Sequence, residues 1–207
     1  MRKYAAELIG TFFLVLTVGF TGIAAGPGVI PPLAIGSVLM VMIYAGGHVS
    51  GAHFNPAVTV AVALRGRCPL SDVVPYWIAQ LAGAGAAAAI VLSLKTAAAV
   101  RLDAVVFAAF VAEFLFTFAL AFVVLNVATA KSTAGNSYFG LAIGFTVLSG
   151  AFAVGDVSGG AFNPAVAVGA MLMGMLPWGK LALYLGAELL AGAAAALVFK
   201  AINPEDR

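Results

Sequence analysis

Charged side chains are scarce in this sequence: Asp, Glu, Lys and Arg together make up 9% of its 207 residues. A soluble domain carries about 25% charged residues, whereas hydrophobic residues here reach 63% of the chain. A water-soluble fold of this length could not bury so much apolar surface. The solvent that we expect is therefore a lipid bilayer.

Cysteine and clustered basic residues are also lacking. Cys68 is the single cysteine, so it cannot form an internal disulfide, and it has no CxxC or metal-site neighbours. The formal net charge of +2 is small and its basic residues are dispersed, which excludes a nucleic-acid-binding surface. No nucleophile, base and orienting residue fall in a recognisable catalytic arrangement. We expect no enzymatic activity, no cofactor, no metal and no nucleic-acid partner.

Long apolar segments are what the sequence has instead. A membrane-spanning helix needs roughly 20 mostly apolar residues, and six segments approach this length, at about 4–24, 33–47, 73–94, 104–128, 138–155 and 179–201. Two further stretches, at about 55–64 and 163–174, are helical in composition but too short to cross. Each begins at Asn-Pro, in which Asn favours a helix cap and Pro the first helical position.

An internal repeat relates the two halves of the chain. Residues 48–58 (HVSGAHFNPAV) and 156–166 (DVSGGAFNPAV) align without a gap at an offset of 108 residues. The same register pairs Tyr76 with Tyr184, Gln80 with Glu188 and Gly36 with Gly144, and an offset of 106 pairs Ala6-Glu7 with Ala112-Glu113. Each half, about 1–103 and 104–207, thus holds three spans and one half-helix. Because three is odd, the second half enters the membrane from the opposite side, as an inverted repeat.

The predicted fold is an all-α polytopic membrane protein in which six transmembrane helices and two re-entrant half-helices form a single domain, 1–207. Charge asymmetry orients it. One side would carry Arg2, Lys3, Arg65, Arg67, Lys131, Lys200 and Arg207, and the other Lys95, Arg101 and Lys180. The positive-inside rule places the first set, with both termini, in the cytoplasm. The half-helix N-termini should then meet near the midplane, where residues 48–54 and 156–162 are predicted to line a pore.

The residues around the two Asn-Pro-Ala boxes, Asn55-Pro56-Ala57 and Asn163-Pro164-Ala165, resemble the paired boxes of aquaporins and aquaglyceroporins. The resemblance covers essentially the whole chain, including Ala-Glu in the first and fourth spans. It implies six tilted helices, two half-helices and a homotetramer with one pore in each subunit.

The physical chemistry of the boxes agrees with this resemblance. Each half-helix N-terminus presents roughly +0.5 of an elementary charge, so two that face each other repel cations, including hydronium. The Asn55 and Asn163 amides can donate to a passing water or hydroxyl oxygen and so interrupt a continuous proton wire.

Four polar residues allow alternative roles. Glu7 and Glu113 could belong to a proton-coupled transporter, but the simpler interpretation is that each accepts hydrogen bonds from the loop backbone of its own half. The resemblance implies the same role. His48 matches the family's cytoplasmic pore-lining histidine, and His53 is expected to contribute its carbonyl group.

Selectivity is where the sequence departs from the family pattern. The resemblance places a constriction at Ile35, Ala151, Gly160 and Val166. Most family members have Arg immediately after the second box, where this chain has Val166, and water-selective members usually have an aromatic residue and a His as well. The expected ring is wide, apolar and uncharged, which argues against strict water selectivity.

The sequence therefore predicts a facilitative channel for water and small uncharged solutes in the cell membrane, favouring solutes larger than water, such as glycerol, undissociated acids and metalloid hydroxides including arsenite. The alternatives are a mainly water-conducting aquaporin, a proton-coupled secondary transporter, because inverted repeats with half-helices also build transporters, and a non-conducting junction protein.

Overall fold

The computed structural model describes residues 1–22, 28–95, 99 and 101–206, and all regular structure in these parts is helical. The long helices are α1 (Arg2–Gly22), α2 (Ile30–Ser50), α4 (Leu70–Leu94), α5 (Val106–Val124), α6 (Phe139–Ser158) and α8 (Leu181–Ile202). Two nine-residue helices are α3 (Pro56–Leu64) and α7 (Pro164–Leu172). Short turns are η1 (Leu125–Thr129), which continues α5, η2 (Lys131–Thr133) and η3 (Trp178–Lys180), which precedes α8.

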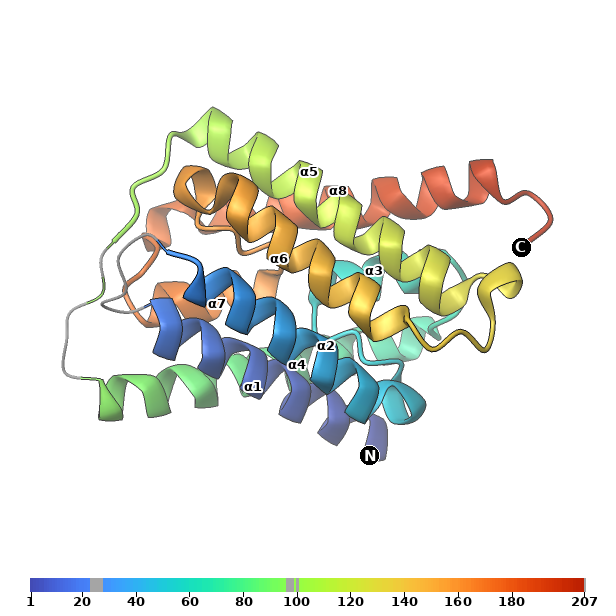
Figure 1. Cartoon of the computed structure of the whole chain (residues 1–207), viewed down its shortest axis with the longest axis horizontal. Helices are drawn as coiled ribbons and strands as arrows, with labels where there is room; N and C mark the ends of the chain where they lie inside the picture. The colour runs from blue at the N-terminus through green and yellow to red at the C-terminus, as the bar shows by residue number, and fades with distance from the viewer. Residues whose placement is uncertain (23–27, 96–98, 100, 207) are drawn as a thin grey trace.

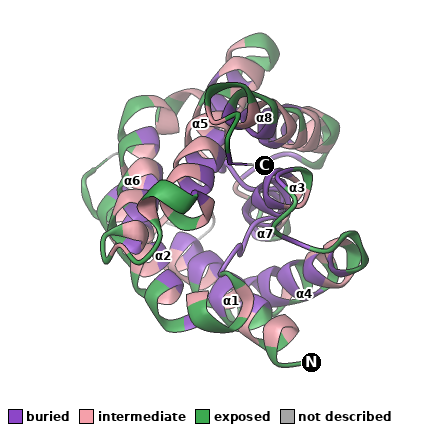
Figure 2. Ribbon diagram, turned by 90° about the vertical axis from the view of Figure 1, so that its right-hand side faces the viewer, coloured by how far each residue is buried: buried purple, intermediate pink, exposed green. Residues whose placement is uncertain are grey.

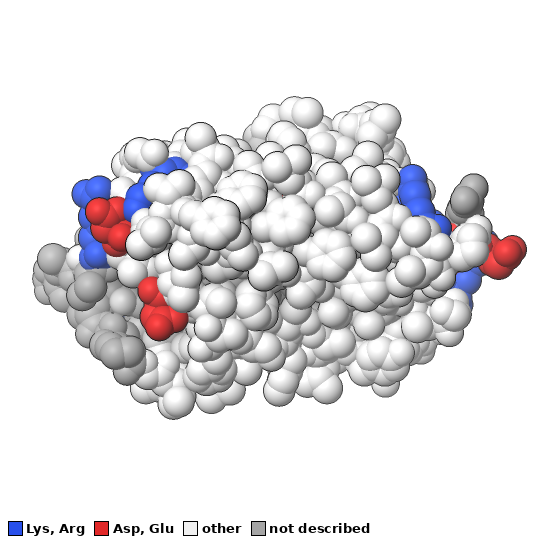
Figure 3. Space-filling model, turned by 90° about the horizontal axis from the view of Figure 1, so that it is seen from above, with Lys and Arg blue, Asp and Glu red and all other residues white. Residues whose placement is uncertain are grey.

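Six helices of the described chain are long and apolar enough to cross a membrane, with mean hydropathies between 1.6 and 2.4. On the face seen in Figure 3, the Lys, Arg, Asp and Glu side chains gather at the two ends of the molecule, with a broad uncharged belt between them. This separation is what a bilayer requires, because hydrocarbon cannot solvate charge. The chain is a multi-pass membrane protein.

Helices α2 and α6 each extend three residues beyond the predicted ends at 47 and 155. Both end at a left-handed glycine, Gly51 with φ 85° and Gly159 with φ 90°, whose N–H donates to the carbonyl four residues earlier. Glycine adopts this conformation without a Cβ penalty and commonly ends helices in this way. The non-helical stretches are therefore 51–54 and 159–162, shorter than predicted. The last residues of the first predicted span, 23–24, lie outside the described residues.

The helices pack as two similar halves. Helix α1 packs against α2 and α4, and α5 packs in the same way against α6 and α8. Each half-helix packs on the last span of the other half, α3 on α8 and α7 on α4. In the end-on view, α3 and α7 lie inside the ring of long helices (Figure 2). The predicted inverted repeat with re-entrant half-helices is confirmed.

The two halves meet where α2 crosses α6. A Cβ on Gly36 would lie 2.8 Å from the Gly144 carbonyl oxygen, and a Cβ on Gly144 would lie 2.5 Å from that of Gly36. Only glycine permits this approach, and small residues bring helices together in lipid. The paired positions noticed in the sequence are thus contact points between the halves.

The two ends of the bundle carry different ionic contacts. The start of α1 and the end of α8 lie at the same end (Figure 1). There, Asp206 accepts from the buried Arg65 guanidinium at 2.7 Å and from the Lys131 backbone N–H at 2.7 Å. At the opposite end Lys180 pairs with Asp103. Arg207, one of the predicted cytoplasmic charges, lies outside the described residues.

Candidate functional site: the junction of the two half-helices

The Asn-Pro-Ala boxes form the N-termini of α3 and α7. Asn55 caps α3, and its Oδ1 accepts from the N–H groups of Ala57 at 2.8 Å and Val58 at 3.3 Å. Asn163 caps α7 in the same way, accepting from Ala165 N–H at 2.9 Å. These bonds use the oxygen of each amide, so its NH₂ group points elsewhere.

The two caps are linked to each other across the centre of the molecule. Asn55 Nδ2 donates to the Phe162 carbonyl at 2.9 Å, and Asn163 Nδ2 donates to the Phe54 carbonyl at 2.8 Å. The half-helix N-termini therefore meet, as predicted, and each amide keeps a second N–H beyond the one used in this exchange. Their partial positive charges face one another at this point.

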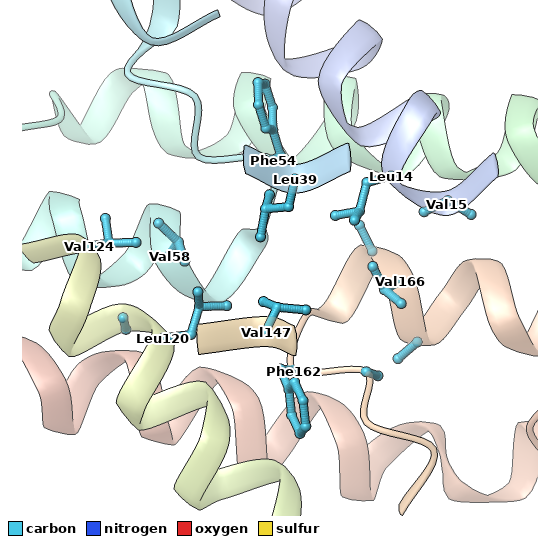
Figure 4. Close-up of a cluster of buried hydrophobic side chains, with 14 of the residues drawn as sticks. Leu14, Val15, Leu39, Phe54, Val58, Leu120, Val124, Val147, Phe162 and Val166 are labelled. Atoms are coloured by element: carbon cyan, nitrogen blue, oxygen red, sulfur yellow. The ribbon is translucent and has the colours of Figure 1, made fainter. Parts of the chain in front are cut away.

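The backbone before each box is held in an uncommon conformation. Phe54 and Phe162 have positive φ angles of 48° and 50°, and Ala52 has φ 51°. Non-glycine residues adopt this region at a cost and persist there where packing enforces it. Phe54 fits against Gly10, where a Cβ would stand 2.2 Å from its ring, and Phe162 fits against Gly150. The two rings point to opposite sides, away from the space between the boxes (Figure 4).

Two buried glutamates support these loops. Glu7 accepts from Ser50 Oγ at 2.7 Å, from the His53 N–H at 2.9 Å and from the Phe54 N–H at 2.7 Å. Its fourth donor is Gln80 Nε2 at 2.8 Å.

Glu113 has the equivalent contacts in the other half. It accepts from Ser158 Oγ at 2.6 Å, the Ala161 N–H at 3.0 Å and the Phe162 N–H at 2.6 Å. Both carboxylates are thus engaged by the loop backbone of their own half, in the arrangement expected for loop supports.

A cavity of about 340 Å³ adjoins the junction. Its walls combine Asn55 and Asn163 with aliphatic side chains, including Leu14, Leu39, Val58, Leu120, Val147 and Val166, which converge on one space in Figure 4. None of the described residues that border it is Asp, Glu, Lys or Arg. Such a space offers a few fixed amide donors within apolar walls.

A second cavity, of about 810 Å³, continues from the first toward the end where Arg67 and Lys131 lie. The two cavities share Ile43, Ala52, His53, Val124 and Ile143, so they adjoin. His48 borders the second cavity, which is where a pore-lining residue of this half would be expected.

His53 has a larger part in the structure than the sequence suggested. It borders both cavities, and its Nδ1 lies 3.1 Å from Thr59 Oγ1, which also accepts from Gln80 Nε2. The repeat gives Ala161 and Ala167 at the matching positions. That asymmetry was the only sequence signal for a side-chain role of His53.

Three of the four predicted filter residues, Ile35, Gly160 and Val166, border the first cavity. Ala151 does not. Its Cα would lie 3.6 Å from a Cβ on Gly160, so Ala151 is a close neighbour of a residue that does border the cavity. The role of these four residues in selecting a solute stays a prediction.

Six spans around two half-helices that meet at interlocked Asn caps define a polytopic membrane protein of the aquaporin type. A family model described as "Major intrinsic protein" matches residues 1–199. Aquaporin NIP1-3 of rice (Oryza sativa subsp. japonica) is 40% identical over 189 residues, covering 84% of this chain and 64% of that protein. Aquaporin Z of Rhodopseudomonas palustris is 35% identical over 230 residues, covering 99% of this chain and 94% of that protein.

The chain belongs to the major intrinsic protein family. This is a family of channels and not of enzymes, so the chain is not an enzyme. The X-ray structure of the aquaglyceroporin from Plasmodium falciparum superposes with a TM-score of 0.77 at 22% identity, covering all of this chain and 95% of that one, which supports the fold. The chain spans slightly less than two thirds of several plant relatives, 63% to 65% of the length of aquaporins NIP1-3 of rice, NIP1-2 of Arabidopsis thaliana and the putative aquaporin NIP4-1 of Arabidopsis thaliana.

Proposed function

We propose that residues 1–207 form one facilitative channel that conducts water and small uncharged solutes. The observation that carries the proposal is the cavity at the half-helix junction, where Asn55 and Asn163 each keep an amide N–H beyond the one donated to a Phe carbonyl of the other half. The oxygen of a neutral solute could replace its hydrogen bonds from water with hydrogen bonds from these amide groups. A cation, in contrast, would meet the positive ends of two helices and no negative side chain on the described walls.

We further propose that the outer constriction favours solutes larger than water, such as glycerol, undissociated acids and metalloid hydroxides including arsenite. The family resemblance implies Arg at the position where this chain has Val166, and Gly160, also assigned to the constriction, has no side chain. The wall at Ile35, Gly160 and Val166 therefore offers neither charge nor side-chain donors, and a narrow polar filter is what strict water selectivity needs.

The buried glutamates support a channel over a proton-coupled transporter. Glu7 and Glu113 are both fully buried, and each is tied to three donors from the loop of its own half. Neither borders either cavity. A carboxylate that accepts bonds from a folded loop holds structure, and a transporter would need it to exchange protons with the path.

Stopped-flow light scattering on proteoliposomes tests the function. Water, glycerol, urea, lactic acid and arsenite are compared, each with and without an imposed proton gradient. We expect neutral solutes to move down their own concentration gradient at a rate that does not change with the imposed proton gradient. Uptake that collapses with the gradient would indicate a transporter, conduction of water alone a mainly water-conducting aquaporin, and no conduction at all a junction protein.

Val166→Arg tests the filter, with Val166→Met as a control of similar length and no charge. Arg should narrow the constriction and add a fixed cation, so that glycerol slows more than water and any anion leak changes. Met should slow glycerol without changing the leak. An unchanged glycerol-to-water permeability ratio in folded Val166→Arg protein would remove Val166 from the filter.

We also propose that the protein is a homotetramer in the cell membrane. Its N-terminus and its C-terminus would both lie in the cytoplasm. The support for the orientation is the position of Arg65, Arg67 and Lys131 together at the end where α1 begins and α8 ends. Native mass spectrometry tests the tetramer, and cysteine labelling in whole cells at positions 131 and 180 tests the orientation.

A further inference from the structure

Glu188 on α8 is a third fully buried carboxyl group, and the proposed conduction path does not use it. Its Oε1 accepts from the Asn163 N–H at 3.0 Å, at the start of the outer half-helix α7. Its Oε2 is equally buried and receives no hydrogen bond from any donor of the described chain. Glu113 accepts from the Phe162 N–H and Glu188 from the N–H of the next residue, Asn163, so the two carboxyl groups lie side by side.

Two carboxylates in contact inside a low-dielectric protein cannot both remain charged, because nothing there offsets their repulsion. The ion pairs between described residues include neither Glu113 nor Glu188. The pair must therefore hold a proton. Glu113 already accepts three hydrogen bonds, which favour its ionised form, so the oxygen left to carry the proton is Glu188 Oε2.

The inner half of the repeat shows what a proton at this position does. Gln80, the repeat partner of Glu188, donates from Nε2 to Glu7 Oε2, the oxygen that also accepts from Phe54. A carboxylic acid is planar like this amide. The acid offers one O–H donor and one carbonyl acceptor, whereas the amide offers two N–H donors and one carbonyl acceptor. A protonated Glu188 would thus give Glu113 the fourth donor that Gln80 gives Glu7.

We propose that Glu188 is held as a neutral carboxylic acid and acts as a positioning residue, donating to Glu113 through one oxygen and holding the Asn163 N–H with the other. In the outer half, the donor to the loop glutamate is thus a carboxylic acid proton of Glu188, whereas in the inner half it is the amide N–H of Gln80. Loss of that proton places two like charges in contact beside the outer box and loosens Asn163 from its position.

The groups around Glu188 leave few other candidates for such a proton. Helix α5 contributes Glu113 as its single titratable side chain, and α8 itself contributes Tyr184, whose hydroxyl donates to the Ser158 carbonyl at 2.5 Å. The half-helices α3 and α7 and the turn η1, which also pack on α8, contain no titratable side chain. Lys180 of η3 pairs with Asp103 at the outer end.

Infrared difference spectroscopy tests the protonation directly. The purified wild type in lipid should show the C=O stretch of a buried protonated carboxyl group at neutral pH, and Glu188→Gln should lack it. Asp206→Asn, which changes a carboxylate outside the spans, is the matched control and should keep it. A wild-type spectrum without this band, or an unchanged band in Glu188→Gln, would overturn the proposal.

Permeability as a function of pH tests the positioning role. Wild-type conduction should fall at alkaline pH and recover on return to neutral pH, whereas Glu188→Gln should conduct as well as the wild type and remain flat. Glu188→Leu lacks both the donor and the acceptor and should lose conduction or folded protein, which Gln rescues. An alkaline loss that persists in Glu188→Gln would contradict this role. Because the infrared band does not depend on the solute, its absence would leave the proposed channel function standing.

Discussion

The half of this protein that carries α3 and the half that carries α7, which the proposed orientation makes the inner and the outer half, share one backbone plan and differ in the chemistry that holds it. Both halves place a left-handed glycine, a strained Phe and an Asn cap in the same order. The inner loop is held by Glu7 with Gln80, His53 and Thr59, whereas the outer loop is held by Glu113 with Glu188 and has alanine where the inner half has His53 and Thr59.

This difference shows that the geometry of a half-helix depends on the pattern of hydrogen bonds and not on one set of residues. Buried N–H groups must find acceptors. In each half the acceptor is a carboxylate, and this carboxylate itself accepts a further hydrogen bond from a side chain of the last span in that half. The chemistry that supplies that donor can change between halves, and with it the sensitivity of each half to pH.

The largest expected effect comes from removing the loop acceptors. Glu7→Leu or Glu113→Leu leaves at least two buried backbone N–H groups without a partner, at a cost of about 1–3 kcal/mol each. We expect either variant to lose most of its folded protein, measured as monodisperse yield in detergent. Glu113→Leu should be the more severe, because it also leaves the buried proton of Glu188 without an acceptor, whereas Gln80 Nε2 keeps Thr59 Oγ1 as an acceptor in Glu7→Leu.

Thr11→Val and Thr117→Val are the matched controls, one turn along the same helices. Both hydroxyls are buried and have no hydrogen-bond partner within the described chain, so replacing them with a methyl group should be neutral or slightly stabilising. If these variants lose as much protein as the glutamate variants, burial at this helix crossing matters more than the hydrogen bonds.

The next largest effects are expected from Asn163→Asp and Asn55→Asp, which should differ in severity between the two halves. Each removes an amide donor, leaves a Phe carbonyl facing a carboxylate and offsets the positive end of a half-helix. Asn163→Asp should be worse, since the new carboxylate would compete with Glu113 for the proton of Glu188, whereas the Gln80 amide of the other half has no such proton to give up. Yield, neutral-solute permeability and cation current under voltage clamp measure this. Equal defects, or variants that conduct normally and exclude cations, would contradict the central-barrier argument.

Gly160 and its repeat partner Ala52 give a smaller contrast in backbone strain. Both have positive φ angles, 63° and 51°. Gly160→Ala adds a Cβ 3.3 Å from the Phe162 ring and should destabilise the protein by about 1–2 kcal/mol. Ala52→Gly relieves strain but makes the unfolded chain more flexible, so its net effect should be under about 1 kcal/mol. Thermal unfolding in one detergent compares them, and a larger loss for Ala52→Gly would contradict this account.

Much of the fold was predictable from the sequence because its main signals are local or repeated. Helix length follows from apolar runs, the half-helix starts follow from Asn-Pro, and the meeting of Asn55 with Asn163 follows from an odd number of spans in each half. The position of Ala151 was less predictable. Every face of α6 is apolar or small, so the pattern does not fix which residue faces the cavity.

Contacts between distant polar residues were also beyond sequence reasoning. The pairing of Gln80 with Glu188 across the repeat was visible, but it indicated only that a charge was dispensable at that position. That Glu188 lies beside Glu113, on the next backbone N–H of the same loop, depends on how α5 packs on α8. The contact between Arg65 and Asp206 joins residues 141 positions apart and has no counterpart in the repeat.

The smallest expected effect contrasts the two ends of the bundle. The Lys131 backbone N–H, followed by Arg65, lowers the pKa of the Asp206 carboxyl group, and Lys180 lowers the pKa of Asp103 at the other end. A lowered pKa means that each contact contributes its full stability above the unfolded value, about 3.9, and loses it as the pH falls through the lower folded value. Asp206→Asn should therefore reduce stability at neutral pH and flatten its decline in acid.

Asp103→Asn should do the same more weakly, because its side chain is 79% exposed whereas that of Asp206 is 12% exposed and solvent screens an exposed pair. Thermal unfolding between pH 3 and pH 7 measures both variants, with Glu205→Gln as the control, since this carboxylate takes no part in the ion pairs of the described residues. If Asp103→Asn had the larger effect, the outer end would be the better anchored of the two, and the buried guanidinium of Arg65 would be held chiefly by its contact with the Phe199 ring, 4.6 Å away.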